Sequence, residues 1–321
     1  MKLATLLAGL LFATLTACSM PAITDSRHAD ATVATTNKLQ ILDHHVIPRD
    51  TEINGLKISE LSGLAWDEDE QLLYAISDKG RLFHFRLVIE NDLIKSVTPV
   101  YGAKLTDAKG ETLNKHRRDA EGLMVWASNN GKKGDSQLII SLEGDPRIVR
   151  FTPQGRALAN IPVPTPVSQV KYMRHSNTGL EAITHHPKYG FITAPEQSVK
   201  GQAIDVHTLY SLKKQWSFKA YPAKNSSITA LDLIPKTNQL LIMERAWSGI
   251  LNPLTISIRR LDLDKCTAGP CAAENLGAFS SSLSVDNFEG MTHIKDNRYL
   301  IVSDDGKHDL LRTLLTLFKL N

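Results

Sequence analysis

Short apolar runs alternate with polar turns along most of the chain. Each unit has a first apolar run, a turn rich in Asp, Asn, Lys, Pro or Gly, and a second apolar run that ends in a polar or acidic residue. This pattern is typical of β-hairpins, and the chain after its apolar N-terminus shows no sustained helical period. The hairpin units are, in chain order, SGLAWDEDEQLLYAISDKG from Ser62, EGLMVWASNNGKKGDSQLIISLEGD from Glu121, EAITHHPKYGFITAPEQ from Glu181, TALDLIPKTNQLLIMERAW from Thr229 and EGMTHIKDNRYLIVSDDG from Glu289.

Further apolar runs between these hairpins have the length of single strands. Examples are RLFHFRLVI, RIVRFTP, HTLYSLKK and ISIRRLDLD. Repeated four-strand units predict an all-β fold, a β-propeller of four-stranded blades, with five visible repeats and a degenerate sixth left open. The last unit ends in TLLTLFKLN and lacks an outer strand, which KLQILDHHVI near the N-terminus can supply. Such closure would remove an exposed sheet edge.

The chain begins MKLATLLAGLLFATLTACSM, a lysine followed by an apolar stretch too short to span a membrane as a mature helix. The ending LTAC resembles the lipobox of bacterial lipoproteins, which implies a signal peptide over residues 1–17 and lipid on Cys18. An ordinary secretory signal with an unrelated cysteine is the alternative. Ser19 after the cysteine favours the outer membrane of a bacterial cell envelope, facing the periplasm. Small polar residues over 18–37 predict a flexible tether, so the propeller domain is expected over 38–321.

Export makes the other two cysteines interpretable. Cys266 and Cys271 flank a turn in DKCTAGPC, and a local disulfide is expected in an oxidising compartment. Their spacing is not that of a CxxC pair. The net charge is +3, the basic residues do not gather into a continuous basic face, and aromatic residues are few, which argues against nucleic acid as a partner. No later apolar run is long enough to span a bilayer, so the lipid anchor is the only expected membrane attachment, and a monomer is expected.

Six sequence blocks, in order, resemble the phytase-like domain family known as esterase-like activity of phytase. The resemblance covers roughly residues 55–320. It implies a hydrolase that acts on small-molecule phosphoesters or esters. The blocks are ELSGLAWDEDEQLLYAISDKG, DAEGLMVW, EGDPRIVRFTPQG, NTGLEAITHHP, LLIMERAW and NFEGMTHIKDNRYLIVSDDG.

Carboxylates recur at the open ends of the predicted hairpins. In an antiparallel hairpin the first residue of one strand faces the last residue of the other. The paired ends are Ser62 and Asp78, Glu121 and Glu143, Glu181 and Glu196, Thr229 and Glu244, and Glu289 and Asp304. Because the inner strands of a propeller all run the same way, these pairs are expected at one mouth of the central channel.

Such a gathering of acids needs a compensating charge. Like charges at short range raise one another's pKa or recruit a cation. Calcium is the most natural divalent cation here, because it takes many oxygen ligands in irregular geometry. The predicted metal ligands are Glu121, Glu181, Glu289, Asp78, Glu143, Glu244 and Asp304.

Basic residues lie in loops that reach the same mouth. A metal can lower the pKa of an attacking water, an arginine can hold a phosphate through two hydrogen bonds, and a histidine can protonate the leaving oxygen. The predicted catalytic residues are Glu121, Glu289, His116, Arg118 and Arg245. Structural interpretations stand beside this one. Aspartates at strand ends commonly form Asx turns, and Gly63, Gly122 and Gly290 can serve close packing alone.

Several catalytic signatures are absent from the sequence. There is no GxSxG nucleophile elbow, P-loop, HExxH motif or RHGxRxP motif, so hydrolysis is expected to use metal-activated water. The alternative is a non-catalytic, calcium-stabilised binding propeller that recognises an envelope ligand or protein, because no single His or Glu stands out as the general base. An oxidoreductase propeller is a third option, but no fingerprint of an organic cofactor supports it.

Overall fold

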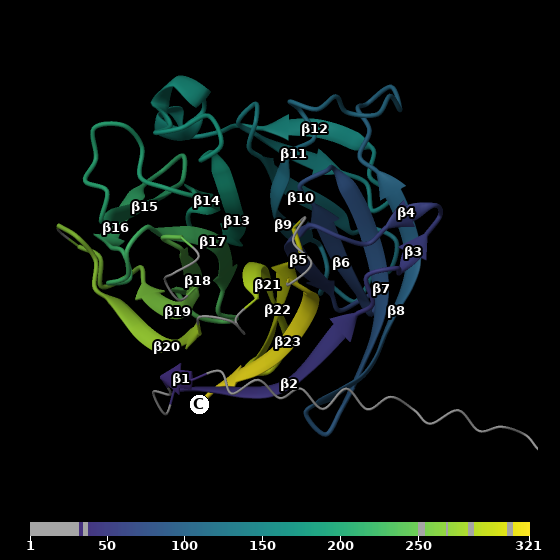
Figure 1. Ribbon diagram of the computed structural model, residues 1–321. Coiled ribbons are helices and arrows are strands. Elements are labelled where there is room, and N and C mark those ends of the chain that lie inside the picture. The colour runs from purple at the N-terminus through teal and green to yellow at the C-terminus, as the bar shows by residue number, and fades with distance from the viewer. Residues whose placement is uncertain (1–31, 35–37, 250–253, 268, 282–285, 307–310) are drawn as a thin grey trace, which may run out of the picture. The chain divides into compact units, whose positions relative to one another are not determined.

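The computed structural model describes residues 32–34, 38–249, 254–267, 269–281, 286–306 and 311–321. These residues form five antiparallel sheets around a central axis, a five-bladed β-propeller (Figure 1). The predicted fold is confirmed, with five blades rather than six. The predicted signal peptide and the lipidation site Cys18 lie outside the described residues. Among the described residues, no helix has the length and apolar character needed to cross a membrane.

The first three blades each contain four consecutive strands, which run in chain order from the innermost to the outermost. Blade one consists of β5 (Leu61–Asp67), β6 (Leu72–Ser77), β7 (Arg81–Glu90) and β8 (Leu93–Lys104). Blade two consists of β9 (Ala120–Trp126), β10 (Gln137–Leu142), β11 (Arg147–Phe151) and β12 (Ala157–Ile161). Blade three consists of β13 (Leu180–His186), β14 (Gly190–Pro195), β15 (Val206–Tyr210) and β16 (Gln215–Lys219).

The last two blades each take up a strand from the N-terminal part of the chain. Blade four consists of β17 (Ser226–Leu233), β18 (Gln239–Ala246), β19 (Leu254–Asp262), β20 (Ala273–Ser281) and, at its edge, β1 (Thr32–Ala34). Blade five consists of β21 (Asn287–Lys295), β22 (Arg298–Asp304), β23 (Thr313–Leu320) and β2 (Leu39–Ile47). The pairing of β2 with β23 confirms the predicted closure. Three residues of the predicted tether, those of β1, belong to blade four instead.

Short elements fill some of the connections. A small hairpin of β3 (Glu52–Ile53) and β4 (Leu56–Lys57) precedes blade one, and two 3-10 turns, η1 (Thr165–Val167) and η2 (Val170–Tyr172), lie between blades two and three. A disulfide joins Cys266 and Cys271, whose Cα atoms are 5.0 Å apart, as predicted.

The core is a set of five apolar clusters, each shared by two adjacent blades. In blade two, for example, β10 is buried along almost its whole length. Both faces of a propeller blade are covered by neighbours, so its central strands are continuous apolar runs rather than alternating ones. Burying one large apolar side chain contributes about 1.5–3 kcal/mol. The blades are thereby held rigidly against one another, and the ends of their inner strands have fixed positions.

Candidate functional site

The inner strand of every blade carries a β-bulge near its start. In β5, Leu61 pairs with Ser77 and Gly63 with Ile76, so Ser62 is the extra residue. Equivalent shifts occur in the other four inner strands. The bulge residues are Ser62, Glu121, Glu181, Thr229 and Glu289. A bulge redirects a side chain, and four of these residues, Ser62, Glu121, Thr229 and Glu289, line one narrow space on the axis.

The residue after each bulge is small. A Cβ atom added to Gly122 would lie 2.8 Å from the backbone nitrogen of Ile183 on the neighbouring inner strand, and one added to Gly290 would lie 2.9 Å from that of Leu64. The inner strands therefore approach one another too closely for larger residues, which confirms the packing role of these glycines. The axial space that remains has a volume of about 10 Å³, which is room for about one water molecule.

A second ring surrounds the bulge residues at the ends of the second strands. Each member lies opposite the residue that stands two positions before the bulge residue of the same blade. They are Asp78, Glu143, Glu196, Arg245 and Asp304. In blade four the register pairs Ile228 with Glu244, so Arg245 rather than Glu244 takes the ring position. Acids from blades one, two, three and five and one arginine from blade four therefore meet here.

Glu244 does not join the cluster that the sequence predicted for it. Its carboxylate accepts a hydrogen bond from the backbone N–H of Tyr221 at 3.0 Å and lies 3.0 Å from Nη1 of Arg259 and 3.1 Å from Nε2 of His207. Burial would raise the pKa of Glu244, but His207 and Arg259 hold it below its usual value. Adjacent strand residues face opposite sides of a sheet, so Glu244 points between blades while Arg245 points to the mouth.

Arg245 neutralises one side of the ring. Its Nη2 donates to Oε1 of Glu196 at 2.9 Å, and its Nη1 donates to Oδ1 of Asn287 at 2.8 Å and to Oε1 of Glu289. Asn287 in turn donates from Nδ2 to Oε1 of Glu289 at 2.8 Å. The neighbouring carboxylates raise the pKa of Arg245 above its already high ordinary value. Blades three, four and five thus contain an internal counter-charge.

Blade two holds carboxylates that could bind one divalent cation. One carboxylate oxygen from each of Asp119, Glu121 and Glu143 lies within 4.8 Å of the others. Oxygen ligands of calcium lie about 2.3–2.6 Å from the ion, so two ligands of one ion can be up to about 5 Å apart. The backbone N–H of Gly179 donates to Oε1 of Glu143 at 2.9 Å and fixes this carboxylate. The three residues therefore fit one cation.

The inner carboxylates are buried without partners. Glu121 is 9% exposed and Glu181 is 6% exposed, and neither carboxylate forms a hydrogen bond with the residues that the structure describes. Burial, followed by the charges of Glu181 and Glu289, raises the pKa of Glu121 well above its usual value. Burial, followed by the charges of Glu196 and Glu143, also raises the pKa of Glu181 well above its usual value. Burial raises the pKa of Glu143 to about 7. These groups therefore hold protons at neutral pH or bind a cation.

Asp78 and Asp304 are already engaged. Nζ of Lys79 lies 2.5 Å from Oδ2 of Asp78 and 3.0 Å from Oε1 of Glu60. Oδ1 of Asp304 accepts the backbone N–H of Gly306 at 2.7 Å, which is the Asx-turn contact that the structural interpretation expects. Burial raises the pKa of both aspartates. Both lie beside the cluster, but each uses an oxygen for a local partner.

The predicted catalytic loop residues border the cluster from one side. His116 is exposed and Arg118 is half-buried. A Cβ atom added to Gly144 would lie 2.7 Å from the carbonyl oxygen of His116, and one added to Gly80 would lie 2.7 Å from Cβ of Arg118. The loop thus lies against the ends of blades one and two. Burial raises the pKa of Asp119, and the charge of Arg118 opposes this effect.

Besides Glu196, which the sequence placed at the mouth but not among the predicted ligands, two members of the cluster were not predicted as site residues. Asp119 belongs to the possible cation site, and Asn287 links Arg245 to Glu289. Each stands two positions before a bulge residue. The equivalent residues in all blades are Glu60, Asp119, Gly179, Ser227 and Asn287. This constant offset was present in the sequence and would have identified Asp119 as a candidate site residue.

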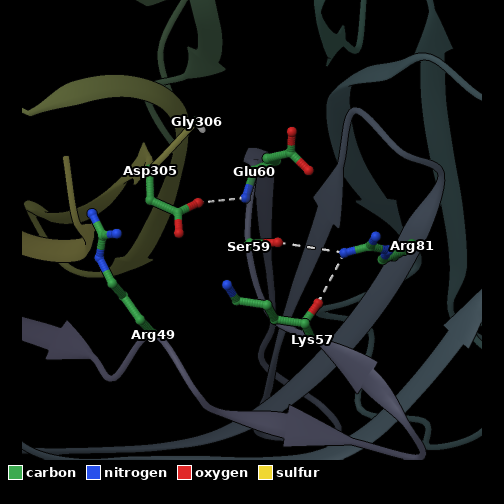
Figure 2. A pocket seen from close by; sticks show the side chains of 7 residues that line it. All are labelled: Arg49, Lys57, Ser59, Glu60, Arg81, Asp305 and Gly306. Carbon is green, nitrogen blue, oxygen red and sulfur yellow. Dashed lines mark hydrogen bonds between the residues drawn. The ribbon is translucent and has the colours of Figure 1, made fainter. Parts of the chain in front are cut away.

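A separate hollow of about 330 Å³ lies between blade one and blade five (Figure 2). It is far larger than the axial space. The residues that line it are Arg49, Lys57, Ser59, Glu60, Arg81, Asp305 and Gly306. It adjoins the ring through Glu60, whose carboxylate shares Lys79 with Asp78.

Comparison with known proteins identifies the family. The family model Phytase-like, described as esterase-like activity of phytase, matches residues 57–307. No curated protein matches the chain. Among solved structures, the chain is similar to the RRP9 WD40 repeats, with 9% identity and a TM-score of 0.45, covering 91% of this chain and 100% of that chain. The family match spans most of the sequence and confirms the resemblance, so the chain belongs to the phytase-like family described as esterase-like activity of phytase.

Proposed function

We propose that this protein is a metal-dependent hydrolase of small-molecule phosphoesters in the bacterial cell envelope. The observation that supports this most strongly is the grouping of Asp119, Glu121 and Glu143 within 4.8 Å at the mouth of a phytase-like propeller. The unpaired, buried carboxylate of Glu121 strengthens the case, because a cation would replace the protons that such groups otherwise hold. Calcium is the first candidate, since all the available ligands are oxygens.

The surrounding residues then have distinct roles. A bound divalent cation would supply charge neutralisation for phosphoryl oxygens and a lowered pKa for an attacking water. Arg118 flanks Asp119 and can hold a phosphoryl oxygen, and the exposed His116 can donate a proton to the leaving oxygen. Arg245 and Glu289 form one hydrogen-bonded unit that fixes the opposite side of the ring. Their role is to position the cluster rather than to bind the cation.

The N-terminal sequence supports a location in the cell envelope. Lipid on Cys18 would attach the chain to the outer membrane, with the propeller in the periplasm as a monomer. Labelling with a radioactive fatty acid tests the anchor, since Cys18→Ser should lose the label and release the protein from membranes. A Cys18→Ser protein that stays labelled contradicts this assignment.

The activity test uses the purified mature protein with aryl phosphates, phosphodiesters and aryl esters, in calcium, magnesium, manganese or EDTA. Metal-dependent turnover of a phosphoester is expected, and Glu121→Gln should lower kcat by at least about 100-fold. Glu90→Gln, which changes an exposed glutamate of β7, is the matched control and should leave kcat unchanged. Absence of turnover on every substrate contradicts the proposed function.

A binding propeller is the second candidate, and one observation favours it. Glu121 and Glu289 line an axial space of only about 10 Å³, which admits a cation or a water but no substrate. A cation held there would stabilise the fold without taking part in chemistry. Under this candidate, calcium raises the melting temperature of the wild-type protein while no substrate is turned over.

A further inference from the structure

The hollow between blades one and five gathers cationic side chains from separate segments. Arg49 follows β2, Lys57 ends β4 and Arg81 begins β7. In Figure 2 these side chains surround the same hollow, with Arg49 on the side of Asp305 and with Lys57 and Arg81 across from it. At about 330 Å³ the hollow accepts a small organic molecule.

The acids of the hollow are occupied by donors of the protein itself. Oδ1 of Asp305 accepts the backbone N–H of Glu60 at 2.7 Å. Oε1 of Glu60 lies 3.0 Å from Nζ of Lys79, which also pairs with Asp78. These carboxylates are therefore held by other groups rather than by the lysine and arginine that face the hollow.

Lys57 and Arg81 form no ion pair with any residue that the structure describes. Nη1 of Arg81 donates to the carbonyl oxygen of Lys57 at 3.1 Å and to Oγ of Ser59 at 3.4 Å, both uncharged acceptors. These contacts fix the guanidinium without pairing it to a carboxylate, although its charge is close enough to Asp78 to oppose the rise that burial causes in the pKa of that carboxyl. The ammonium of Lys57 has no hydrogen-bond partner in the same described part of the chain. Two positive charges are thus positioned at the wall of an open hollow.

We propose that this hollow binds the phosphoryl group of a small molecule, held by Arg81 and Lys57 with Arg49 at its margin. A guanidinium can offer parallel N–H groups to a phosphate, and an ammonium adds a compact charge. Free phosphate and a phosphate ester share this chemistry. The identity of the ester as a substrate rests on the proposed function, whereas the binding itself depends only on the hollow.

The test is calorimetric titration of the full mature protein in EDTA with inorganic phosphate and, separately, with phenyl phosphate. Saturable binding with a Kd in the millimolar range or below is expected for at least one of them. Binding of both indicates an ester ligand, and binding of inorganic phosphate alone indicates the free ion. Lys57→Gln should weaken binding about tenfold, since it removes one charge-assisted hydrogen bond to the phosphoryl group.

Matched variants keep the result interpretable. Arg81→Gln should also weaken binding at least about tenfold, while Arg86→Gln, an exposed arginine on the same strand, should not change it. Glu121→Gln should abolish hydrolysis but retain phosphate binding, which separates failure of this site from failure of the proposed function. The proposal is overturned by absence of saturable binding, or by a Kd that neither Lys57→Gln nor Arg81→Gln changes.

Discussion

The guanidinium of Arg245, at the end of β18, donates a hydrogen bond to the carboxylate of Glu196, just after the end of β14, over 2.9 Å. The same guanidinium holds Glu289 on β21. One cation from blade four thus serves acids from blades three and five. The acids of blade two have no such partner among the described residues, and this asymmetry is the reason that the candidate cation site lies there.

Removal of the Arg245 charge should be costly for the fold. Arg245→Met leaves Glu196 and Glu289 without their shared cation, and breaking a buried ion pair costs about 3–5 kcal/mol. A clear fall in the free energy of unfolding is expected in urea titrations. The triple variant Arg245→Met, Glu196→Gln, Glu289→Gln should recover much of the loss. If the single variant unfolds at the same urea concentration as Arg86→Gln, the internal counter-charge is unimportant.

The cation-free protein should become less stable as pH rises. Glu143 and Glu289 have pKa values of about 7 in the folded state, raised by burial, against 4.5 ordinarily. Between these values the folded state keeps protons that the unfolded chain has released, so the free energy of unfolding falls from about pH 4.5 to about pH 7. Thermal melts in EDTA should show this trend. Calcium should flatten it, because it competes with the protons. A melting temperature that rises steadily from about pH 4.5 to about pH 7 contradicts this prediction.

Two glutamates should respond oppositely to neutralisation. Glu121→Gln removes a buried, unpaired carboxyl that is costly to bury whether it is ionised or must take up a proton, so it should raise stability in EDTA at about pH 8 while abolishing the calcium-induced rise in melting temperature. Glu244→Gln breaks the buried contact with Arg259 and should lower stability by about 3 kcal/mol while the calcium-induced rise remains. Differential scanning calorimetry with and without calcium measures both effects. Loss of the calcium effect in Glu244→Gln would show that it belongs to the cation site.

The close approach of the inner strands predicts that position 122 does not tolerate a residue larger than glycine. A Cβ at position 122 would lie 2.5 Å from Oγ of Ser141 and 2.8 Å from the backbone nitrogen of Ile183. Gly122→Ala should therefore destabilise the fold by about 1–3 kcal/mol through overpacking. At Gly277 the nearest atom to an added Cβ is 3.5 Å away, so Gly277→Ala is the control and should change stability by less than about 0.5 kcal/mol. Equal melting temperatures for the two variants would exclude tight axial packing.

The repeated hairpin pattern of the sequence determined the fold. Apolar runs of strand length, separated by turn residues and repeated five times, can bury both faces of each sheet only if the sheets pack on one another. The unpaired edge of the last unit similarly required a strand from elsewhere, and residues 39–47 supplied it. Recurrence of Glu121, Glu181 and Glu289 at the start of three units also placed these residues together, because equivalent repeats occupy equivalent positions.

Tertiary structure decided which neighbours these residues have. Counting along the strand suggested Glu244 for the ring, but the β17–β18 hairpin is one residue longer than the hairpins of blades three and five, so Arg245 lies opposite Ser227 and turns inward instead. A one-residue shift exchanges the two faces of a strand, and no pattern of residue types shows where it occurs. The hollow formed by Lys57 and Arg81 depends on the packing of the β3–β4 hairpin against blade one. Such contacts join residues that are distant in the chain, so only the folded molecule defines them.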